Sequence, residues 1–394
     1  MDSVVATLES ISPDAYTNAA ARRRVKEAAW RLFTRMQTPW ERSFEIADEQ
    51  PVLFATIQTC MDLGIFEGWV NGDNGEKGLQ ELRGLCHKEI EANFLRRMLR
   101  CLGVFAVIEE TGEDRWKPTP FSVALGDPES TCAQTFLAGT HHMLDAGRNF
   151  PEFLARTAYR EPLDPANSNY KDMPAAHGLD FFARCQADPK YQASFISGIM
   201  KGLVEHKLNW TGVYDITRLA SGLREDQTCF VDIGGGHGID CVRMLTAQPK
   251  LPPGAVVLQD QSDVIEMARS KLDAKIRTMQ HDFFTPQPIK GARAYFTHAV
   301  LHDWADDEAG RILQALSPAM AKGVSKLLLY ENVIPPTEAS KLQVTLDMSL
   351  MQALSSFERT EGMWQQLLET NGFKIIKIWR HAEAIESVIE AELA

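Results

Sequence analysis

A histidine near acidic residues is the group in this chain best suited to acid–base chemistry. His302 lies in the sequence Leu-His-Asp-Trp, directly after an apolar run, and a neutral imidazole near pH 7 can take a proton from a hydroxyl. Glu331 ends a later apolar run, and a carboxylate there could fix the tautomer and orientation of the ring. The alternative for His302 is packing or an N-cap for a helix beginning at Asp306, and Asp303 could equally cap that helix.

A glycine-rich turn is the second feature with chemical meaning. Gly234, Gly236 and Gly238 follow the apolar run 229–233 and precede a helical pattern. This order predicts a buried parallel strand that turns tightly into a helix, with glycine where a Cβ would clash with a ligand. The spacing lacks the third glycine of G-x-G-x-x-G, so a dinucleotide pyrophosphate fits poorly. Asp232, at the strand end, is expected to accept from the amides of the turn or from a ligand ammonium.

Further apolar runs follow at the intervals of a Rossmann-type sheet, and each ends near a polar or aromatic cluster. Asp260 is placed to take ribose hydroxyls, as acids at the tip of a second strand do. Asp282 and Phe283 suit an adenine, because the carboxylate can accept from the exocyclic amine while the ring packs on the base. His302 and Glu331 follow the last two runs, so one site at the carboxyl ends of the strands is predicted. The predicted strands cover 256–258, 276–279, 294–296 and 326–330.

The chain resembles the S-adenosylmethionine-dependent class I O-methyltransferases, nearest to the homodimeric branch with plant caffeate-type and fungal secondary-metabolite enzymes. The resemblance covers nearly the whole chain. It implies a Rossmann-like sheet of the methyltransferase kind, S-adenosyl-L-methionine as cofactor, and Glu331 and Glu358 flanking His302 as the catalytic base. The segments that carry it are Val-Asp-Ile-Gly-Gly-Gly-His-Gly, Leu-His-Asp-Trp-Ala-Asp-Asp-Glu, Tyr-Glu-Asn-Val-Ile-Pro and Phe-Glu-Arg-Thr-Glu-Gly-Met-Trp.

One position departs from the family pattern. His298 stands four residues before His302, where the family often has a lysine or arginine that can meet the carboxylate of the cofactor. A neutral imidazole would hold that carboxylate more weakly. Either an asparagine or backbone groups compensate for the change, or the cofactor site is retuned.

Length, composition and charge exclude several classes of protein. The chain has 394 residues, 44% of them hydrophobic, which is enough for a large core and two or three domains. The net charge of −12 argues against nucleic acid or an anionic membrane as the main partner. No signal peptide and no run of 18 apolar residues is visible. The seven scattered cysteines fit reduced thiols, so a cytoplasmic enzyme without a metal site is expected.

The N-terminal third, residues 1–130, is predicted to be a helical arm followed by a winged helix, which is three helices and a hairpin. A winged helix can bind DNA, but acidic neighbours of the third helix and the global charge argue against that function. In the resembled family this mainly α module dimerises, so a homodimer through the N-terminal domain is expected. The predicted helices cover 15–36, 51–61, 79–86 and 93–102, and the predicted hairpin strands cover 104–109 and 114–117.

Residues 131–213 are predicted to form a helical bridge that is interrupted by a loop near 162–174. Members of the resembled family draw substrate-pocket residues from this segment. His141, His142 and Met200 are pocket candidates here, although methionines and aromatics at helical spacing are more often core. Of the two adjacent histidines, at least one is expected at the surface.

The catalytic domain is predicted to run over 214–394. Trp304 is a further pocket candidate, because it follows the His-Asp pair and could bound the methionine end of the cofactor. The domain is expected to end with a helix and an antiparallel pair of strands. These elements cover 357–370, 373–379 and 387–393.

Two functions fit these residues. The first is an O-methyltransferase acting on a phenolic or enolic small molecule in secondary metabolism, with His302 as the general base. The alternative is a pericyclase or dehydratase that binds S-adenosylmethionine without transferring its methyl, the sulfonium lending electrostatic help. The retained His302 favours the first function, whereas His298 and the His141-His142 pair keep the second one open.

Overall fold

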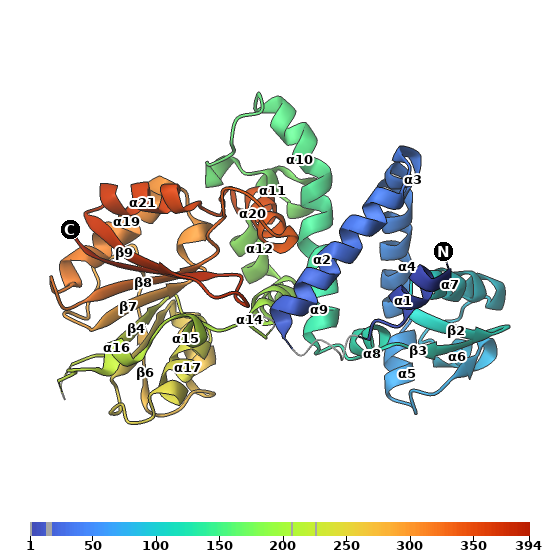
Figure 1. Ribbon diagram of the computed structural model, residues 1–394, viewed down its shortest axis with the longest axis horizontal. Helices are drawn as coiled ribbons and strands as arrows, with labels where there is room; N and C mark the ends of the chain where they lie inside the picture. Colours follow the sequence, from blue (N-terminus) through green and yellow to red (C-terminus); the bar gives the residue numbers. More distant parts are fainter. Residues whose placement is uncertain (1, 13–17, 206–207, 225–226) are drawn as a thin grey trace. The chain divides into compact units, whose positions relative to one another are not determined.

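The computed structural model describes residues 2–12, 18–205, 208–224 and 227–394 and forms two compact units (Figure 1). The N-terminal unit contains Met1–Gly139 and Gln192–Leu203, and the catalytic unit contains Thr140–Tyr191 and Val204–Ala394. The segment predicted as a bridge therefore contributes to both units. The three-part division of the chain stays a prediction.

The N-terminal unit is mainly helical and has its own core, in which Trp69 and Trp116 are almost completely buried. Its small antiparallel sheet has the order β1-β3-β2. The predicted helices and hairpin are present, and the assignment as a winged helix stays a prediction. The elements are α1 Asp2–Glu9, α2 Ala19–Met36, α3 Pro39–Phe44, η2 Glu45–Glu49, α4 Gln50–Asp62, α5 Ile65–Val70, β1 Lys77–Gly78, α6 Leu79–Leu85, α7 Ala92–Val104, β2 Ile108–Gly112, β3 Arg115–Pro118, α8 Pro120–Gly126, α9 Thr131–Ala138 and η6 Ser194–Met200.

Two boundaries in this unit differ from the sequence prediction. The first hairpin strand begins at Ile108, because Val104 still belongs to α7. The helix closes with paired backbone bonds, from the Val107 amide to the carbonyl of Leu102 and from the Ala106 amide to that of Gly103, a common helix end. The first part of the helix predicted over 15–36 falls on residues 15–17, which lie outside the described part of the chain.

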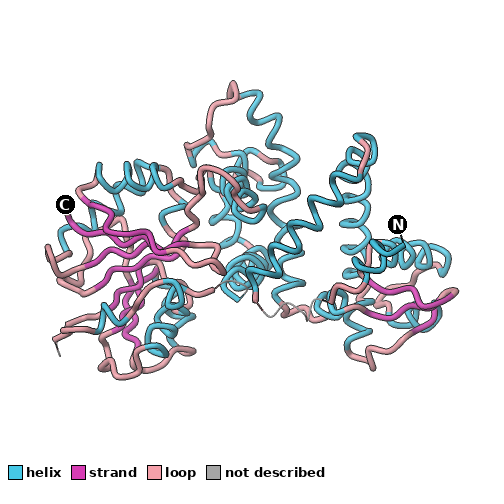
Figure 2. The backbone as a smooth tube through the Cα atoms, in the orientation of Figure 1, coloured by secondary structure: helices cyan, strands magenta, loops and turns pink. Residues whose placement is uncertain are grey.

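The catalytic unit is built on a sheet with the strand order β6-β5-β4-β7-β8-β10-β9 (Figure 2). The first five strands in this order are parallel, and β10 pairs antiparallel with both β8 and β9. The predicted strands and the predicted terminal antiparallel pair are thus confirmed. The strands are β4 Phe230–Ile233, β5 Val256–Asp260, β6 Ile276–Gln280, β7 Ala294–His298, β8 Lys326–Glu331, β9 Phe373–Trp379 and β10 Ser387–Leu393.

The two faces of the sheet are each covered by helices, as continuous apolar strands require. Side chains alternate along β4, so Phe230 packs in one core cluster and Val231 in the other. Helices α15 to α18 cover the face of the first cluster, and α19 and α21 cover the opposite face (Figure 1). These helices are α15 Trp210–Val213, α16 Thr217–Ala220, α17 Ile239–Ala247, α18 Ser262–Arg269, α19 Asp306–Leu316 and α21 Glu361–Thr370.

A second group of helices in the same unit packs beside the sheet. Within it, Asn169 on α11 donates to the carbonyls of Ala146 on α10 and of Gln352 on α20. This buried side chain therefore joins three helices that are far apart in sequence. The group contains η3 Gly139–Met143, α10 Leu144–Arg156, α11 Asn169–Asp172, α12 Phe181–Ala187 and α20 Lys341–Leu354.

The helix predicted over 357–370 begins four residues later than expected. Thr360 is its N-cap and accepts from the amide of Met363, so the helical residues start at Glu361. The segment 356–359 is buried and non-helical, and the carbonyl of Arg359 accepts from the amide of Ile334. This difference matters for function, because Glu358 is placed by an extended segment instead of a helix.

Helices of membrane-spanning length and apolarity are absent from the described residues.

Candidate active site

The glycine turn after β4 has the backbone that its sequence predicts. Gly234, Gly236 and Gly238 have positive φ angles of 68°, 56° and 75°, a region that side chains disfavour. A Cβ on Gly235 would lie 2.4 Å from the carboxylate of Asp232, so this residue must also stay small. The turn leads directly into α17, as predicted.

The acid at the end of β5 reaches back to this turn. One carboxylate oxygen of Asp260 accepts from the amide of Gly236 at 2.8 Å, and the other accepts from the amide of Gln261 at 2.7 Å. Burial raises the pKa of Asp260. The side chain is therefore fixed beside the glycine turn, and its role in binding ribose hydroxyls stays a prediction.

The expectation that Asp232 accepts from the amides of the turn is wrong. The amides of Gly234 and Gly235 donate to the carbonyl of Gln259, and Asp232 accepts only from the thiol of Cys241 in the described part of the chain. Its other oxygen is buried without a hydrogen-bond partner there. Burial and the nearby charge of Asp240 raise the pKa of Asp232 well above its usual value.

An aromatic cluster follows β6. Phe283 lies over the glycine turn, because a Cβ on Gly234 would meet its ring at 3.5 Å. Trp304 packs edge-on against Phe284, with ring centroids 4.9 Å apart. Asp282 is exposed and accepts from the amide of Phe284, which fixes the start of this loop. The structure thus brings Phe283 and Trp304 together beside the turn, and the adenine role of Asp282 stays a prediction.

His298, at the end of β7, is held between two carboxylates. Its Nδ1 lies 2.6 Å from Asp240 on α17, and its Nε2 lies 3.3 Å from Glu386, just before β10. The other oxygen of Asp240 accepts from Arg243 at 2.9 Å. Burial alone lowers the pKa of His298, but the two carboxylates outweigh burial and raise the pKa to about 10. The expectation of a neutral imidazole at this position is wrong: the side chain is a cation at neutral pH.

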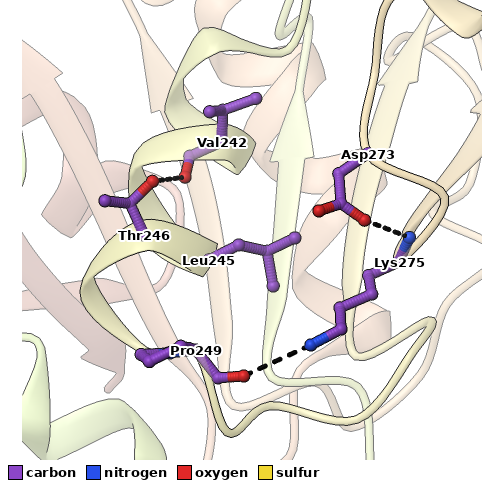
Figure 3. A pocket seen from close by; sticks show the side chains of 6 residues that line it. All are labelled: Val242, Leu245, Thr246, Pro249, Asp273 and Lys275. Atoms are coloured by element: carbon purple, nitrogen blue, oxygen red, sulfur yellow. Dashed lines mark hydrogen bonds between the residues drawn. The ribbon is translucent and has the colours of Figure 1, made fainter.

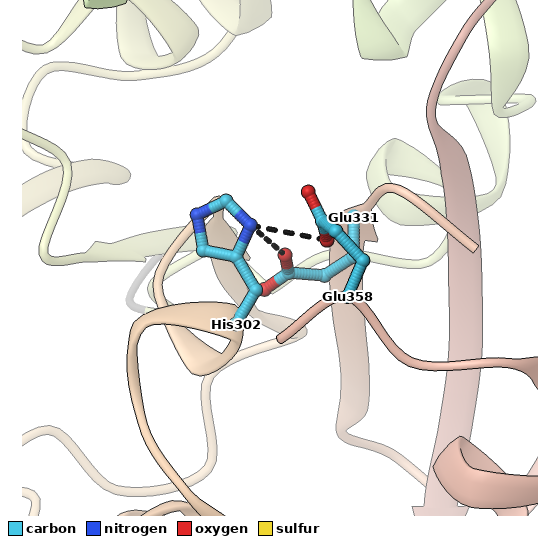
Figure 4. A group of neighbouring side chains, drawn as sticks. All are labelled: His302, Glu331 and Glu358. Atoms are coloured by element: carbon cyan, nitrogen blue, oxygen red, sulfur yellow. Dashed lines mark hydrogen bonds and ion pairs between the residues drawn. The ribbon is translucent and has the colours of Figure 1, made fainter. Parts of the chain in front are cut away.

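His302, Glu331 and Glu358 converge as the resemblance implies (Figure 4). The Nδ1 atom of His302 lies 3.2 Å from Glu358 and 3.8 Å from Glu331. Figure 4 shows the other ring nitrogen turned away from both glutamates. His302 is in the 3-10 turn η7 Leu301–Asp303, directly beyond β7, so its imidazole stands at the carboxyl ends of the strands.

Glu331 is completely buried at the end of β8, and its two carboxylate oxygens face different groups. One oxygen accepts from the amides of Val300 and Leu301, at 3.3 and 3.1 Å, and so fixes the turn that carries His302. The other oxygen has no hydrogen-bond partner among the described residues and faces the imidazole. Burial raises the pKa of Glu331 to about 7. This carboxyl group is thus poised to exchange a proton near neutral pH.

Asp303 is a third acid at the imidazole. Its carboxylate lies 3.4 Å from Nε2 of His302, on the side opposite the glutamates. The alternative that Asp303 caps α19 is wrong, since the N-cap is Ala305 and no side chain accepts there. Burial raises the pKa of Asp303 to about 6.

The acids around His302 decide its charge. Burial lowers the pKa of His302, but Glu358, followed by Asp303 and Glu331, outweighs burial and raises the pKa to about 10. The expectation of a neutral imidazole near pH 7 is therefore wrong for this arrangement of acids. The ring is an imidazolium that holds its Nδ1 proton toward Glu358 and a second proton on Nε2.

The predicted histidine pair occupies a separate part of the catalytic unit. His142 is buried, with Nδ1 at 2.6 Å from the hydroxyl of Tyr170 and Nε2 at 3.2 Å from the carbonyl of Tyr191. Arg184 donates to the same hydroxyl and to the carbonyl of His141. Burial lowers the pKa of His142 to about 4, so its ring is neutral and committed to this network. His141 is half-buried.

Met200 ends η6 in the N-terminal unit and is 46% exposed. It belongs to a different compact unit from the other predicted site residues. The roles of His141, His142, Met200 and Trp304 in binding a substrate remain predictions.

A shallow hollow lies at the opposite end of the sheet (Figure 3). It is lined by Leu245 near the end of α17, by Pro249 just after this helix, and by Lys275, which precedes β6. Lys275 donates to the carbonyl of Pro249 across it. The hollow is at the amino end of β6, away from the edge where His302 and Asp260 gather.

Comparisons with known proteins agree with the geometry at the strand ends. The O-methyltransferase domain family matches residues 161–374, more than half of the chain. The chain belongs to the O-methyltransferase family. It is 38% identical over 391 residues to O-methyltransferase ATR12 of Stachybotrys chlorohalonatus, covering 99% of this chain and 98% of that protein. It is 33% identical over 395 residues to O-methyltransferase mfmE of Annulohypoxylon moriforme, covering 99% and 95%.

Two solved structures have the same fold as this chain. LepI in complex with SAM superposes with a TM-score of 0.88 at 23% identity, covering 100% of both chains. The crystal structure of OxaC gives a TM-score of 0.82 at 23% identity, covering 100% of this chain and 98% of that one. The predicted α/β fold with a Rossmann-like methyltransferase sheet is confirmed.

O-methyltransferases of this family use S-adenosylmethionine, and the residues at the strand ends fit that cofactor. A Cβ on Gly236 would meet no heavy atom within 4 Å, so open space lies beside the turn. The unpartnered oxygen of Asp232 suits an ammonium group, and Asp260 suits a ribose. Phe283 offers an aromatic face close to the turn. When bound, the cofactor supplies an electrophilic methyl group on a sulfonium.

Sequence reasoning missed several residues of this candidate site. Asp240 and Glu386 are the partners that make His298 a cation, and Arg359 contacts the turn of His302. Arg359 had a signal, since it directly follows Glu358 in one of the segments that carry the resemblance. Glu386 had none, because its approach to His298 depends on how β10 inserts into the sheet.

Proposed function

We propose that the protein transfers a methyl group from S-adenosylmethionine to a hydroxyl of a phenolic or enolic small molecule in secondary metabolism. The observation that carries the proposal is the contact between Nδ1 of His302 and Glu358 at 3.2 Å, which leaves Nε2 on the outer side of the ring. An orienting acid on one nitrogen and a reactive second nitrogen are what a general base requires.

His302 must lose a proton before it can serve as that base. We propose that Nε2 is deprotonated in the complex with cofactor, because a second positive charge in the same site lowers the pKa of an imidazolium. Asp303 is placed to receive the proton, since its carboxylate lies 3.4 Å from Nε2 and its pKa of about 6 is close to neutral. In this scheme Glu358 keeps the Nδ1 proton in place while Nε2 accepts the proton of the substrate hydroxyl.

The charge of His302 also supports the second candidate function. An imidazolium with a pKa of about 10 is a good hydrogen-bond donor to a carbonyl oxygen, and a weak base. A pericyclase or dehydratase that keeps the methyl of its cofactor would use His302 in this form. A structural neighbour is described as a pericyclic reaction enzyme and has a TM-score of 0.89 at 23% identity, so the same fold occurs in an enzyme of pericyclic reactions.

One experiment separates the two functions. The purified protein is incubated with S-adenosylmethionine labelled in its methyl group and with a panel of phenols, enols and quinone-methide precursors, and products are weighed by mass spectrometry. A product heavier by the labelled methyl, with one S-adenosylhomocysteine per product, supports the transferase. A product of unchanged mass, or lighter by one water, with the cofactor unspent, supports the alternative.

Variants make this experiment specific to the site. In the transferase, His302→Ala is expected to lower kcat by about 10²- to 10⁴-fold, the contribution of a positioned base. His381→Ala changes an exposed histidine of the same unit and is the matched control. Equal activity of His302→Ala and the control would contradict His302 as the base.

We further propose a cytoplasmic homodimer that forms through the N-terminal domain. Large apolar side chains are exposed along the helices of that unit, including Met36 at 77%, Trp40 at 69% and Ile46 at 58%. An apolar surface of this kind supports association with a second copy. All seven cysteines are free, which fits a reducing compartment. Light scattering of the purified protein tests the dimer, and a monomer of 44.1 kDa would contradict it.

A further inference from the structure

Arg359 is a completely buried arginine that the proposed chemistry does not use. Its side chain has an exposed fraction of 0%, and it directly follows Glu358 in the extended segment before α21. The guanidinium lies 4.8 Å from the ring of Phe357 and 5.1 Å from that of Trp364, so aromatic faces form part of its surroundings. A buried arginine is costly unless its donors are satisfied, and their partners therefore indicate its purpose.

Within the described part of the chain, its side-chain hydrogen bonds all go to the short stretch that carries His302. One terminal nitrogen donates to the carbonyl of Leu301 at 2.9 Å, and the other donates to the carbonyl of Trp304 at 2.7 Å. The Nε atom donates to Asp306 at 2.9 Å. The guanidinium therefore spans the turn from the residue before His302 to the residues after Asp303.

The same extended segment holds His302 in two other ways. The hydroxyl of Ser356 donates to the backbone carbonyl of His302, and Glu358 contacts its imidazole. Three nearby residues thus fix the backbone of the turn on both sides of His302 and the ring itself. The opposite flank of the turn is fixed by Glu331, through the amides of Val300 and Leu301.

We propose that Arg359 is a positioning residue for His302, which keeps the turn Leu301–Asp303 in register with Glu358 so that the imidazole stays aligned. The inference rests on the proposed function and deepens it. We place Arg359 outside the reacting atoms, since each of its three side-chain nitrogens donates to the turn or to Asp306. Misplacement of a catalytic group by about 1 Å can cost about 10²-fold in rate, so this alignment has a measurable effect.

The geometry requires arginine in particular. Its planar fork reaches two carbonyls and a carboxylate in fixed directions, whereas a lysine ammonium is a point charge on a flexible stem. Arg359→Lys therefore keeps the charge and most of the apolar stem and loses the alignment. Asp306→Asn weakens the ion pair between Arg359 and residue 306. The side chain of Asp306 is 54% exposed and so tolerates substitution.

The test compares these two variants with matched controls in the full-length protein. Asp307→Asn makes the same charge change at the exposed neighbour of Asp306, and Arg380→Lys alters an exposed arginine paired with Glu361. For each variant, kcat, KM, the Kd of S-adenosylmethionine by calorimetry, the melting temperature and the imidazole ¹⁵N resonances of His302 are measured.

Arg359→Lys is expected to lower kcat by about 10²-fold and Asp306→Asn by about fivefold, with cofactor Kd changed less than threefold. The His302 resonances are expected to shift in both variants and to stay in place in the controls. If Arg359→Lys fails to fold, the kcat and the His302 resonances of Asp306→Asn decide whether the proposal stands. Parental kcat and parental His302 resonances in the folded variants would overturn the proposal, as would an equal loss of cofactor affinity and kcat.

The proposed function and this inference fail in different ways. If the parent protein transfers no methyl to any compound of the panel, the proposed function fails, but the His302 resonances still report whether Arg359 positions the ring. If the parent is active and the resonances do not respond to Arg359→Lys, the inference fails while the proposed function stands.

Discussion

The imidazole of His298 lies 2.6 Å from the carboxylate of Asp240, which stands 58 residues earlier in the chain. Together with Glu386 on its other nitrogen, this contact converts histidine into a cation at the position where the resembled family often has lysine or arginine. The positive charge of the family position is thus retained by a different residue type. Both ring nitrogens face carboxylates, so we expect His298 to influence the cofactor site through its charge and through the placement of α17.

Removal of this cation is expected to disturb both folding and cofactor binding. His298→Gln removes the positive charge between Asp240 and Glu386, although Arg243 still pairs with Asp240, and should cost about 3 kcal/mol of unfolding free energy, as breaking a buried ion pair does. His298→Lys restores one charge and should recover part of the loss. Urea unfolding and calorimetric titration with S-adenosylmethionine measure the two effects. Unchanged stability and affinity in His298→Gln would rule out the cationic clamp.

Stability should depend on pH in a direction set by the two buried imidazoles. The pKa values of His298 and His302 are raised from 6.5 to about 10 in the folded protein. Each raised pKa contributes stability that is fully present below pH 6.5 and is lost as the pH rises toward 10. Urea midpoints are therefore expected to fall between pH 7 and 10. The same series on His298→Gln should be flatter, and an identical slope in parent and variant would contradict the assignment.

The two glutamates beside His302 should not be equivalent. Glu358→Gln removes the charge next to Nδ1, so the pKa of His302 should fall and kcat should drop by about 10²-fold. Glu331→Gln should be milder, because an amide oxygen can still accept from Val300 and Leu301. Kinetics together with ¹⁵N titration of the imidazole check this order. A larger loss in Glu331→Gln than in Glu358→Gln would show that Glu331 carries the orienting charge.

The glycine turn offers a steric prediction. The methyl group of Gly235→Ala would lie 2.4 Å from Asp232 and 2.6 Å from Leu258, so the turn must shift. Cofactor affinity is expected to fall by about tenfold or more, with a loss of stability typical of overpacking, about 1–3 kcal/mol. Gly362→Ala, at a helical glycine with open space around its Cβ position, is the control and should bind normally. Normal binding by both variants would show that the turn tolerates the methyl group.

Activity is expected to survive removal of divalent cations. The donor atoms of His302, Glu331 and Glu358 lie within 4.8 Å of one another, a spacing that a metal ion could use. The Nδ1 proton between His302 and Glu358 competes with such an ion, because a metal ligand must be deprotonated. Dialysis against a chelator should therefore leave kcat unchanged. A loss that zinc or magnesium restores would make this cluster a metal site.

The sequence alone determined the sheet and the chemistry at its edge. Apolar runs that end in Gly234, Asp260, His302 and Glu331 predicted the strands and the side of the sheet where their carboxyl ends meet, because parallel strands in an open sheet share that edge. The resemblance added Glu358 and the cofactor. These features follow from local sequence patterns, which are present in the chain before it folds.

Only the tertiary structure decided the charges of His298 and His302 and the contacts that hold the turn of His302 in place. The protonation of His302 and His298 depends on Asp240, Glu358 and Glu386, which come from three different segments, and no local pattern states that these segments converge. The non-helical path of 356–359 likewise follows from burial of Arg359 against the turn of His302. A pKa is set by distances between groups and by loss of solvent, and both exist only after the chain has packed.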